Sequence, residues 1–268
     1  MPEGNVIHNQ ARRLRNLFKG ESVVIDSPQG RFSVESKLVT DHVLTRVEAH
    51  GKHLFIGMDN GLWIHVHLGL FGKWRIAHGE APDPIGQIRM RIRSDSGFAE
   101  LRGPTTCEVL DSAAKKEAVR KIGPDPIRKA DPTPAWEKVH RSSTAIGSLL
   151  MDQRVFAGVG NIYRAEVLFR HNISPYRAGR EVSRAEFDAI WADLVELMSK
   201  GTRRGRIDTV RPEHMPRAMG RPAREDRHGG EVYVYRRDGQ HCYLCGAEIQ
   251  MADMQGRKLY WCPKCQAA

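Results

Sequence analysis

The sequence has 268 residues, of which 40% are hydrophobic and 28% are charged, a composition typical of globular proteins and unlike that of disordered or fibrous chains. No apolar run approaches the roughly 20 residues that a membrane helix needs, and the N-terminus lacks a signal-peptide layout, so we expect a cytoplasmic protein without a membrane partner. The 42 Lys and Arg residues exceed the 32 Asp and Glu residues, and the resulting net charge of +10 favours a polyanionic partner such as nucleic acid.

The first part of the chain predicts one helix followed by short strands. Apolar residues recur at helical spacing over Asn5–Phe18, and Gly20 follows them. In a later stretch Ile88, Met90 and Ile92 alternate with arginines, as in a strand with one apolar and one basic face. The same period of two predicts strands over Ser22–Asp26, Val43–Ala49, Lys52–Met58, Leu62–Leu68, Phe98–Arg102 and Thr106–Leu110. These elements indicate a β-sandwich or a barrel-like first domain.

A proline-rich segment then marks a domain boundary. Lys121–Pro134 contains four prolines, and the region from Ala135 to Lys200 is predicted to be helical. The strongest helix begins at Ser183, which forms a capping box with Glu186, and Gly201 is expected to end this helix.

A glycine-bearing turn, AGVGN, separates a short predicted helix at Ile146–Asp152 from a second helix that starts near Asn161. Gly158 and Gly160 allow a tight turn, and the N-terminus of the second helix offers free N–H groups to a phosphate. On its own, Asn161 is interpreted as an ordinary N-cap residue. The arrangement is typical of a helix–turn–helix that binds DNA.

The segment from Val210 to Gly230 has no periodicity and predicts a long mobile loop. Ten arginines and no lysine lie between Gly201 and Arg237. Because arginine is the better residue for bidentate phosphate contacts, this bias favours a nucleic-acid surface.

Four cysteines near the C-terminus have the spacing of a metal site, C-x2-C-x16-C-x2-C. We predict one structural zinc ion rather than two disulfides, because the chain is expected to be cytoplasmic. Arg257 falls at the tip of the hairpin between the two pairs, and Cys107 is expected to be a small core residue rather than a nucleophile. The predicted ligands are Cys242, Cys245, Cys262 and Cys265.

The chain resembles the formamidopyrimidine-DNA glycosylase/endonuclease VIII family in three stretches: the MPEG start, AGVGNIYRAEVLF and GRKLYWCPKC. The MPEG start resembles the endonuclease VIII branch of that family. The resemblance implies an α+β fold with two domains. A β-sandwich with an N-terminal helix precedes a helical domain with a helix–two-turn–helix and a C-terminal β-hairpin zinc finger. We place the boundaries at 1–125 for the sandwich, 126–230 for the helical domain and 231–268 for the zinc finger.

The resemblance also implies a catalytic pair. Once Met1 is removed, Pro2 is the nucleophile and Glu3 is its acid partner. An α-amino group titrates near ~7.7, so a useful fraction is neutral and attacks the sugar C1′ to give an iminium. The iminium acidifies the neighbouring sugar protons, and β- and δ-elimination then cleave the strand. Glu3 protonates the opening sugar ring and shuttles protons afterwards.

Further residues are assigned by the same resemblance. One lysine holds a phosphate near the lesion, three polar residues contact DNA, and two apolar residues fill the gap left by a flipped base. The lysine is Lys52, the polar residues are His67, Asn161 and Arg257, and the apolar residues are Leu70 and Phe71. Without the resemblance, Lys52 would be an ordinary turn lysine, and the two apolar residues would be core.

Two positions depart from the family pattern. Val6 stands where the family often has Glu, and Gly69 stands where a polar residue is expected beside the apolar wedge. The first departure changes the lining of the lesion pocket, and the second removes a contact to the orphaned base.

The sequence therefore predicts a monomeric, nucleoid-associated DNA glycosylase and AP lyase of base excision repair with one structural zinc ion. We expect it to remove oxidised bases, pyrimidines in particular, and to act on damaged DNA, either duplex or single-stranded. One alternative is a lyase-dominant enzyme with weak base excision. The other is a non-catalytic, zinc-containing DNA-binding protein.

Overall fold

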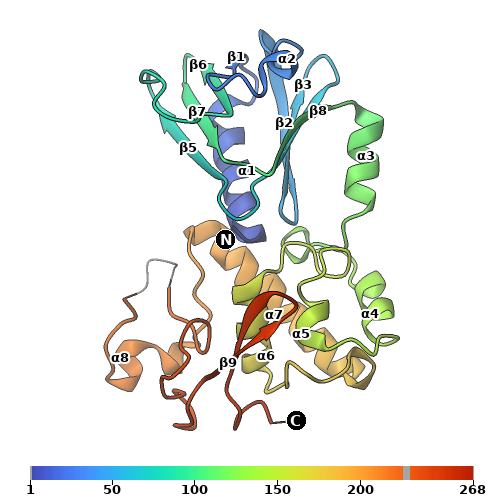
Figure 1. Cartoon of the computed structure of the whole chain (residues 1–268), viewed down its shortest axis with the longest axis vertical. Helices are drawn as coiled ribbons and strands as arrows, with labels where there is room; N and C mark the ends of the chain where they lie inside the picture. The colour runs from blue at the N-terminus through green and yellow to red at the C-terminus, as the bar shows by residue number, and fades with distance from the viewer. Residues whose placement is uncertain (1, 226–229, 268) are drawn as a thin grey trace. The chain divides into compact units, whose positions relative to one another are not determined.

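The computed structural model describes residues 2–225 and 230–267, and the contacts within it divide the chain into two units, Met1–Lys121 and Ile122–Ala268 (Figure 1). The first unit is a β-sandwich with an N-terminal helix, and the second is helical with a C-terminal β-hairpin, which confirms the predicted fold class. The finer division into three domains stays a prediction. Within the described residues, no helix combines the length and the apolar character needed to cross a bilayer.

The first unit contains one eight-stranded antiparallel sheet in the order β5-β7-β6-β1-β2-β3-β4-β8. Its strands are β1 (Ser22–Asp26), β2 (His42–His50), β3 (His53–Met58), β4 (Trp63–His67), β5 (Lys73–His78), β6 (Met90–Ser94), β7 (Gly97–Arg102) and β8 (Thr106–Leu110). Its helices are α1 (Gly4–Phe18), α2 (Ser33–Ser36) and α3 (Ser112–Arg120). The predicted helix and strands are present, whereas β5, α2 and α3 were not predicted.

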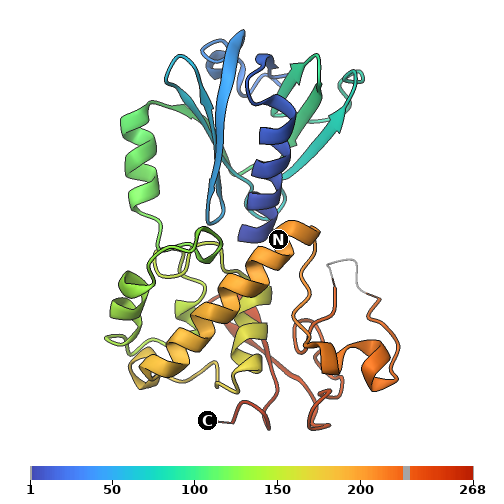
Figure 2. The same cartoon turned by 180° about the vertical axis from the view of Figure 1, so that it is seen from behind.

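The core of the first unit forms around α1. In both views α1 lies between the strands β5, β6 and β7 on one side and β2, β3 and β8 on the other (Figures 1 and 2). Its apolar stripe is fully or almost fully buried and consists of Ile7, Ala11, Leu14, Leu17 and Phe18. The predicted alternation in the sixth strand is confirmed, because the side chains of Met90 and Ile92 are fully buried while Arg91 and Arg93 form ion pairs with Asp26.

Two turns at strand ends in the first unit carry or adjoin predicted site residues. His50 pairs with His53 across a two-residue turn, in which Gly51 has a φ of 55° and supplies the left-handed conformation that a tight hairpin needs. This β2–β3 hairpin reaches the same end of the unit as the N-terminal end of α1 in both views (Figures 1 and 2). The β4–β5 turn follows His67 directly.

The second unit is built around the long helix α7. Its helices are η1 (Pro126–Arg128), α4 (Thr133–Val139), α5 (Ile146–Leu149), α6 (Asn161–Arg170), η2 (Gly179–Glu181), α7 (Arg184–Arg204), η3 (Pro212–His214) and α8 (Pro216–Met219), and its strands are β9 (Gln250–Met254) and β10 (Arg257–Trp261). The capping box of Ser183 and Glu186 is confirmed. The predicted stop at Gly201 is wrong: Gly201 is buried inside the helix, and Gly205, with a φ of 73°, ends it. Packing offsets the cost of about 1 kcal/mol that an internal glycine imposes.

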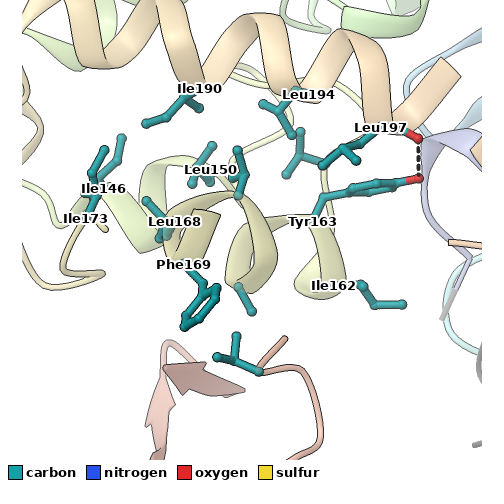
Figure 3. Close-up of a cluster of buried hydrophobic side chains, with 14 of the residues drawn as sticks. Ile146, Leu150, Ile162, Tyr163, Leu168, Phe169, Ile173, Ile190, Leu194 and Leu197 are labelled. Carbon is teal, nitrogen blue, oxygen red and sulfur yellow. Dashed lines mark hydrogen bonds between the residues drawn. The ribbon is translucent and has the colours of Figure 1, made fainter. Parts of the chain in front are cut away.

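The hydrophobic core of the second unit joins its helices to the C-terminal hairpin. Figure 3 shows Ile190, Leu194 and Leu197 of α7 above the side chains of α6, with the Tyr163 hydroxyl donating a hydrogen bond of 3.5 Å to the carbonyl oxygen of Leu197. The same buried cluster includes residues of the cysteine-bearing segment, namely Cys242, Ile249, Tyr260 and Cys262. The predicted zinc finger therefore shares a core with the helices.

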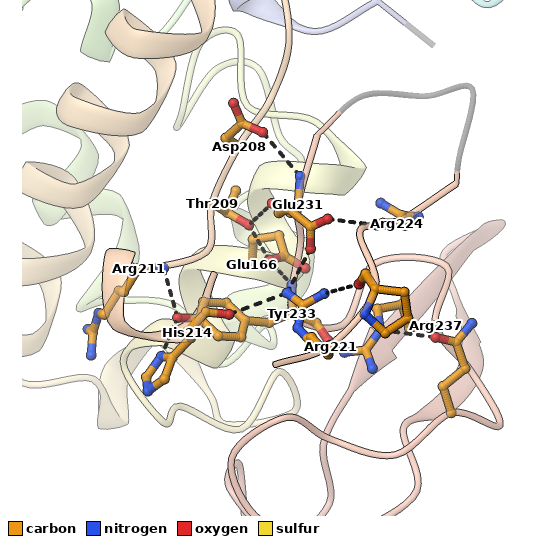
Figure 4. A network of polar contacts seen from close by, with 12 residues as sticks. Glu166, Asp208, Thr209, Arg211, His214, Arg221, Arg224, Glu231, Tyr233 and Arg237 are labelled. Atoms are coloured by element: carbon orange, nitrogen blue, oxygen red, sulfur yellow. Dashed lines mark hydrogen bonds and ion pairs between the residues drawn. The ribbon is translucent and has the colours of Figure 1, made fainter. Parts of the chain in front are cut away.

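A buried carboxylate holds the two ends of the predicted mobile loop (Figure 4). Glu166, on α6, is fully buried and accepts hydrogen bonds from the backbone N–H groups of Tyr233, Val234 and Tyr235 at 2.7, 2.8 and 2.9 Å. It also accepts one from the Thr209 hydroxyl at 2.5 Å. The loop itself contains η3 and α8, and residues 226–229 lie outside the described residues.

The arginine-rich segment binds its own unit more than the sequence suggested. The Arg221 guanidinium lies 2.7 Å from the carboxylate of Glu231 and over the ring of Tyr243. The side chain of Arg237 is almost fully buried and donates to the carbonyl oxygens of Tyr233 and His241. Further arginines with partners in this unit are Arg206, Arg211 and Arg224. The bias toward arginine is therefore in large part structural and is weak support for a nucleic-acid surface.

Candidate active site and nucleic-acid interface

The predicted catalytic pair lies at the start of α1. Glu3 is the N-cap residue, its carbonyl oxygen accepts a hydrogen bond of 2.9 Å from the N–H of Val6, and its side chain is only 1% exposed. Its side chain does not cap the helix. A negative charge at a helix N-terminus is favoured by the helix dipole, which lowers the cost of burying this carboxylate. Pro2 is half-buried beside it.

Asn5 is a candidate site residue that sequence reasoning missed. Its side chain is 1% exposed, and within the described residues neither its amide nitrogen nor its amide oxygen has a hydrogen-bond partner. A buried polar group without partners costs about 1–3 kcal/mol, so such groups concentrate where a ligand supplies the missing bonds. Nothing in a single sequence marks this position, because asparagine in the first turn of a helix is ordinarily read as a cap. The next residue, Val6, is half-buried.

A histidine cluster lies on one face of β2, β3 and β4 and consists of His50, His53, His65 and His67. His53 follows Lys52 directly and pairs with His67 across the strands, with their ring centroids 4.8 Å apart. The structure thus brings the predicted phosphate-binding lysine and the predicted DNA-contacting histidine to one end of the sheet. The cluster was not predicted, since its members are separated in the sequence and meet only through strand register.

Hydrogen bonds fix the orientation of two of these rings. His65 Nδ1 lies 2.8 Å from Glu108 Oε1, and His65 Nε2 lies 2.9 Å from His53 Nδ1. Since the carboxylate only accepts, the network assigns a proton to His65 Nδ1, and one further proton lies between His65 Nε2 and His53 Nδ1. A chain of three groups therefore runs from Glu108 to the ring beside Lys52.

The environment keeps the imidazole rings of His53 and His67 neutral. Burial, followed by the nearby charges of His67 and His65, lowers the pKa of His53 to about 3. Burial is also the largest cause of the lowered pKa of His67, with His65 and Lys52 contributing. Both rings are consequently neutral near pH 7.

A second set of contacts supports the same face of the sheet. Glu48 accepts a hydrogen bond of 2.6 Å from Lys115 Nζ and lies 3.3 Å from His50 Nε2. Burial alone would raise the pKa of Glu48, but these hydrogen bonds outweigh it and lower the pKa. Glu48 is thus a fixed anion that anchors α3 to the strand leading into the hairpin.

The predicted apolar wedge is exposed. Leu70 is 48% and Phe71 is 84% exposed, in the turn that follows the fourth strand. These fractions exclude the alternative that both residues are core. Large apolar side chains at the tip of a turn gain nothing in water, so this position is typical of a contact to another molecule. Their insertion into DNA stays a prediction.

In the second unit Asn161 bonds to the backbone of the residue that follows Arg257. Asn161 is the first residue of α6, and the interpretation as an N-cap is wrong, because Gly160 occupies that position. Its amide nitrogen donates a hydrogen bond of 2.8 Å to the carbonyl oxygen of Lys258, and its amide oxygen accepts one from Arg164. Arg257 precedes Lys258 at the exposed tip of the β9–β10 hairpin.

The four cysteines fit a zinc ion. Their sulfur atoms all lie within 4.8 Å of one another, and the structure contains no disulfide between them. Two pairs are separated by 3.9 Å (Cys242 and Cys265) and 3.4 Å (Cys245 and Cys262). Tetrahedral coordination with Zn–S bonds of about 2.3 Å requires sulfur separations of about 3.8 Å. Four thiolates fill such a site, so the ion it suits is structural.

The cysteine site is joined to the helices by one glutamine. The side chain of Gln266 is 3% exposed; its oxygen accepts from the N–H of Cys262 at 3.0 Å, and its nitrogen donates to the carbonyl oxygen of Ile173 at 3.0 Å. The fifth cysteine, Cys107, lies apart in β8, where burial raises the pKa of its thiol to about 12. Such a thiol is a poor nucleophile, in keeping with the predicted packing role.

Comparisons with known proteins match both units. The model described as the formamidopyrimidine-DNA glycosylase N-terminal domain matches residues 1–107, and the one described as the formamidopyrimidine-DNA glycosylase H2TH domain matches residues 122–211. Endonuclease 8 1 of Mycobacterium tuberculosis is 47% identical over 99% of this chain and 100% of the relative. Endonuclease 8 of Escherichia coli is 30% identical with the same coverage. A solved complex of Lactococcus lactis Fpg with abasic-site DNA shares the fold, with a TM-score of 0.79, 23% identity, and coverage of 99% of this chain and 100% of that chain.

Proposed function

The chain belongs to the formamidopyrimidine-DNA glycosylase/endonuclease VIII family, and on that premise we propose that Pro2, with Met1 removed, is its nucleophile. Members of this family are DNA glycosylases and AP lyases of base excision repair, and this chain is one of them. The secondary amine of Pro2 attacks C1′ of the damaged nucleoside and displaces the base. The resulting iminium then allows elimination of the 3′ phosphate and afterwards the 5′ phosphate.

The burial of Glu3 directly after Pro2 is the observation that carries this proposal. A carboxyl group at a helix start, out of water and next to the amine, is suited to protonate the sugar ring oxygen as C1′ is attacked. It can then accept and return protons during elimination. Burial beside the amine is what this proton-transfer role requires of the Glu3 side chain.

The remaining predicted residues divide between the two units. In the first, Lys52 binds a phosphate close to the reacting sugar, and the neutral ring of His67 contributes a hydrogen bond. In the second, the amide of Asn161 and the exposed guanidinium of Arg257 bind backbone phosphate. Lys52 is supported by its position in the β2–β3 turn and Arg257 by its exposed position beside the β9–β10 turn. Asn161 is supported by its place at the start of α6, where its amide bonds the carbonyl oxygen of Lys258 and the guanidinium of Arg164.

One zinc ion completes the second unit in this proposal. When bound to Cys242, Cys245, Cys262 and Cys265, it cross-links the turns at the base of the β9–β10 hairpin. The hairpin then holds Arg257 rigidly beside Asn161. The ion takes no part in the reaction itself, since its coordination is complete.

We further propose that oxidised pyrimidines are the preferred substrates. Support comes from the MPEG start and from the similarity to relatives named Endonuclease 8. The apolar Val6 favours a second candidate, a lyase-dominant enzyme that excises bases poorly, because it offers no hydrogen bond to a damaged base. Excision of thymine glycol from duplex DNA at a rate comparable to cleavage of an abasic site would exclude the second candidate.

Borohydride trapping tests the nucleophile. We expect the untagged protein to form a covalent adduct with a duplex that contains one abasic site, and a variant with a fixed extension ahead of Pro2 to form none. Both proteins should bind a duplex with a stable abasic analogue equally well. An adduct formed by the extended variant would place the nucleophile elsewhere, and no adduct with either protein, despite binding, would favour the non-catalytic alternative.

A further inference from the structure

Gly69, the glycine beside the apolar wedge, has no room for a side chain. A Cβ atom built on it would lie 1.9 Å from the Thr105 hydroxyl oxygen and 3.1 Å from the Thr105 Cβ. Its φ of 65° is also one that residues other than glycine adopt at a cost. The hydroxyl of Thr105 therefore occupies the volume into which a side chain at position 69 would extend.

Backbone contacts hold Thr105 in a fixed position relative to the wedge. The N–H of Thr105 donates a hydrogen bond of 2.9 Å to the carbonyl oxygen of His67, at the start of the wedge turn. The N–H of Gly72 donates one of 3.0 Å to the carbonyl oxygen of Leu68 and closes the same turn. Pro104, the residue directly before Thr105, is buried and anchors the chain at this point. The β4–β5 and β7–β8 turns thus pack together as one tip. The first turn contributes the side chains of Leu70 and Phe71, and the second contributes that of Thr105.

The Thr105 hydroxyl is available to a ligand. The residue is exposed, and among the described residues no hydrogen bond engages its side chain. Leu70 and Phe71, on the same tip, are exposed apolar side chains. A polar group fixed at the edge of an apolar wedge suits a ligand that is flat and apolar on its faces and polar at its edge, which describes a nucleobase.

We propose that the hydroxyl of Thr105 contacts the Watson–Crick edge of the orphaned base, in place of the side chain that Gly69 lacks. This inference rests on the proposed function, since it requires Leu70 and Phe71 to enter the gap beside that base. A hydroxyl both donates and accepts, and it rotates to suit its partner. It therefore serves an orphaned adenine or guanine alike, and either purine lies opposite an oxidised pyrimidine.

The test compares Thr105→Val, which keeps the shape and removes the hydroxyl, with Thr105→Ser, which keeps the hydroxyl. Single-turnover cleavage is measured at an abasic site opposite adenine or guanine, in a duplex whose opposite position carries no base, and in single-stranded DNA. Loss of one hydrogen bond predicts that the valine variant is about 3- to 10-fold slower, or binds that much more weakly, opposite either purine. We expect both variants to match the wild type on the two substrates without an orphaned base.

An equal loss on all four substrates would overturn the inference, as would full activity of Thr105→Val opposite both purines. Thermal melting confirms that each variant is folded. Failure of the proposed function is distinguishable, because the wild type would then form no borohydride adduct on any substrate.

The packing is tested separately: Gly69→Ala should lower the melting temperature, and adding Thr105→Gly should recover part of the loss. If Thr105→Gly recovers none of it, the hydroxyl does not occupy the volume beside Gly69.

Discussion

Replacing Glu166 with Gln should destabilise the second unit strongly. One carboxylate oxygen accepts from the N–H groups of Val234 and Tyr235, and the other accepts from the N–H of Tyr233 and from the hydroxyl of Thr209. A glutamine keeps one acceptor oxygen but turns an NH2 group toward the other two donors. The Thr209 hydroxyl can rotate and accept, whereas the backbone N–H of Tyr233 cannot.

The magnitude follows from this count of donors. One charge-assisted hydrogen bond of about 1.5–3 kcal/mol is lost, one buried N–H is left without a partner, and the remaining bonds lose their charge assistance. We expect the free energy of unfolding to fall by about 2–4 kcal/mol. Because the orphaned donor is buried, water cannot compensate for it.

Urea denaturation measures the change in stability, and hydrogen exchange measured amide by amide locates it. Residues 233–235 should exchange faster in Glu166→Gln than in the wild type, while the sandwich of the first unit is unchanged. The matched control is Glu196→Gln, since Glu196 is exposed on α7 and its substitution should change stability by no more than about 0.5 kcal/mol. A wild-type urea midpoint together with protected amides at 233–235 would refute the reasoning.

Four further outcomes are expected. Glu3→Gln should abolish base excision in a gel assay while abasic-site trapping persists, because an abasic site has no base to displace; equal loss of both would contradict this role. The lowered pKa values of His53 and His67 mean that the unfolded chain binds more protons below about pH 6.5. Stability should accordingly rise with pH from about 3 to 6.5, by up to about 1.4 kcal/mol per pH unit from His53 and with a smaller contribution of the same sign from the more exposed His67, and His53→Leu should flatten that slope in urea titrations. Removal of zinc by a chelator should weaken DNA binding and lower the melting temperature, both restored by added zinc; unchanged melting would argue against a bound ion. Arg257→Ala should reduce the slope of log affinity against log salt by about 1, as expected for one lost phosphate contact.

Much of the fold was predictable because its periodic elements are strong. The strands around Met90 and Ile92 bury alternate residues, as the sequence pattern predicts. The fifth strand was missed because it lies at the edge of the sheet and has no fully buried residue to generate a pattern. The end of α7 was misplaced because a glycine inside a helix and a glycine that ends one look alike in a sequence.

The candidate site was predictable only in part, and for a physical reason. The cysteines are recognisable from local spacing, and Pro2 and Glu3 from their place in a family motif. The chain from Glu108 to His65 and His53 depends on strand register, which joins residues far apart in the sequence. The relation between Gly69 and Thr105 likewise exists only after two turns have packed together.

The contacts of Arg221 and Arg237 limit which residues can replace them. Arg237 uses both terminal nitrogens to reach two different carbonyl oxygens, while its guanidinium plane covers the ring of Tyr243. Arg221 covers the same ring while it binds Glu231. A lysine carries the same charge but has neither the planar fork nor the flat face, so exchange at these two positions conserves net charge and loses the contacts.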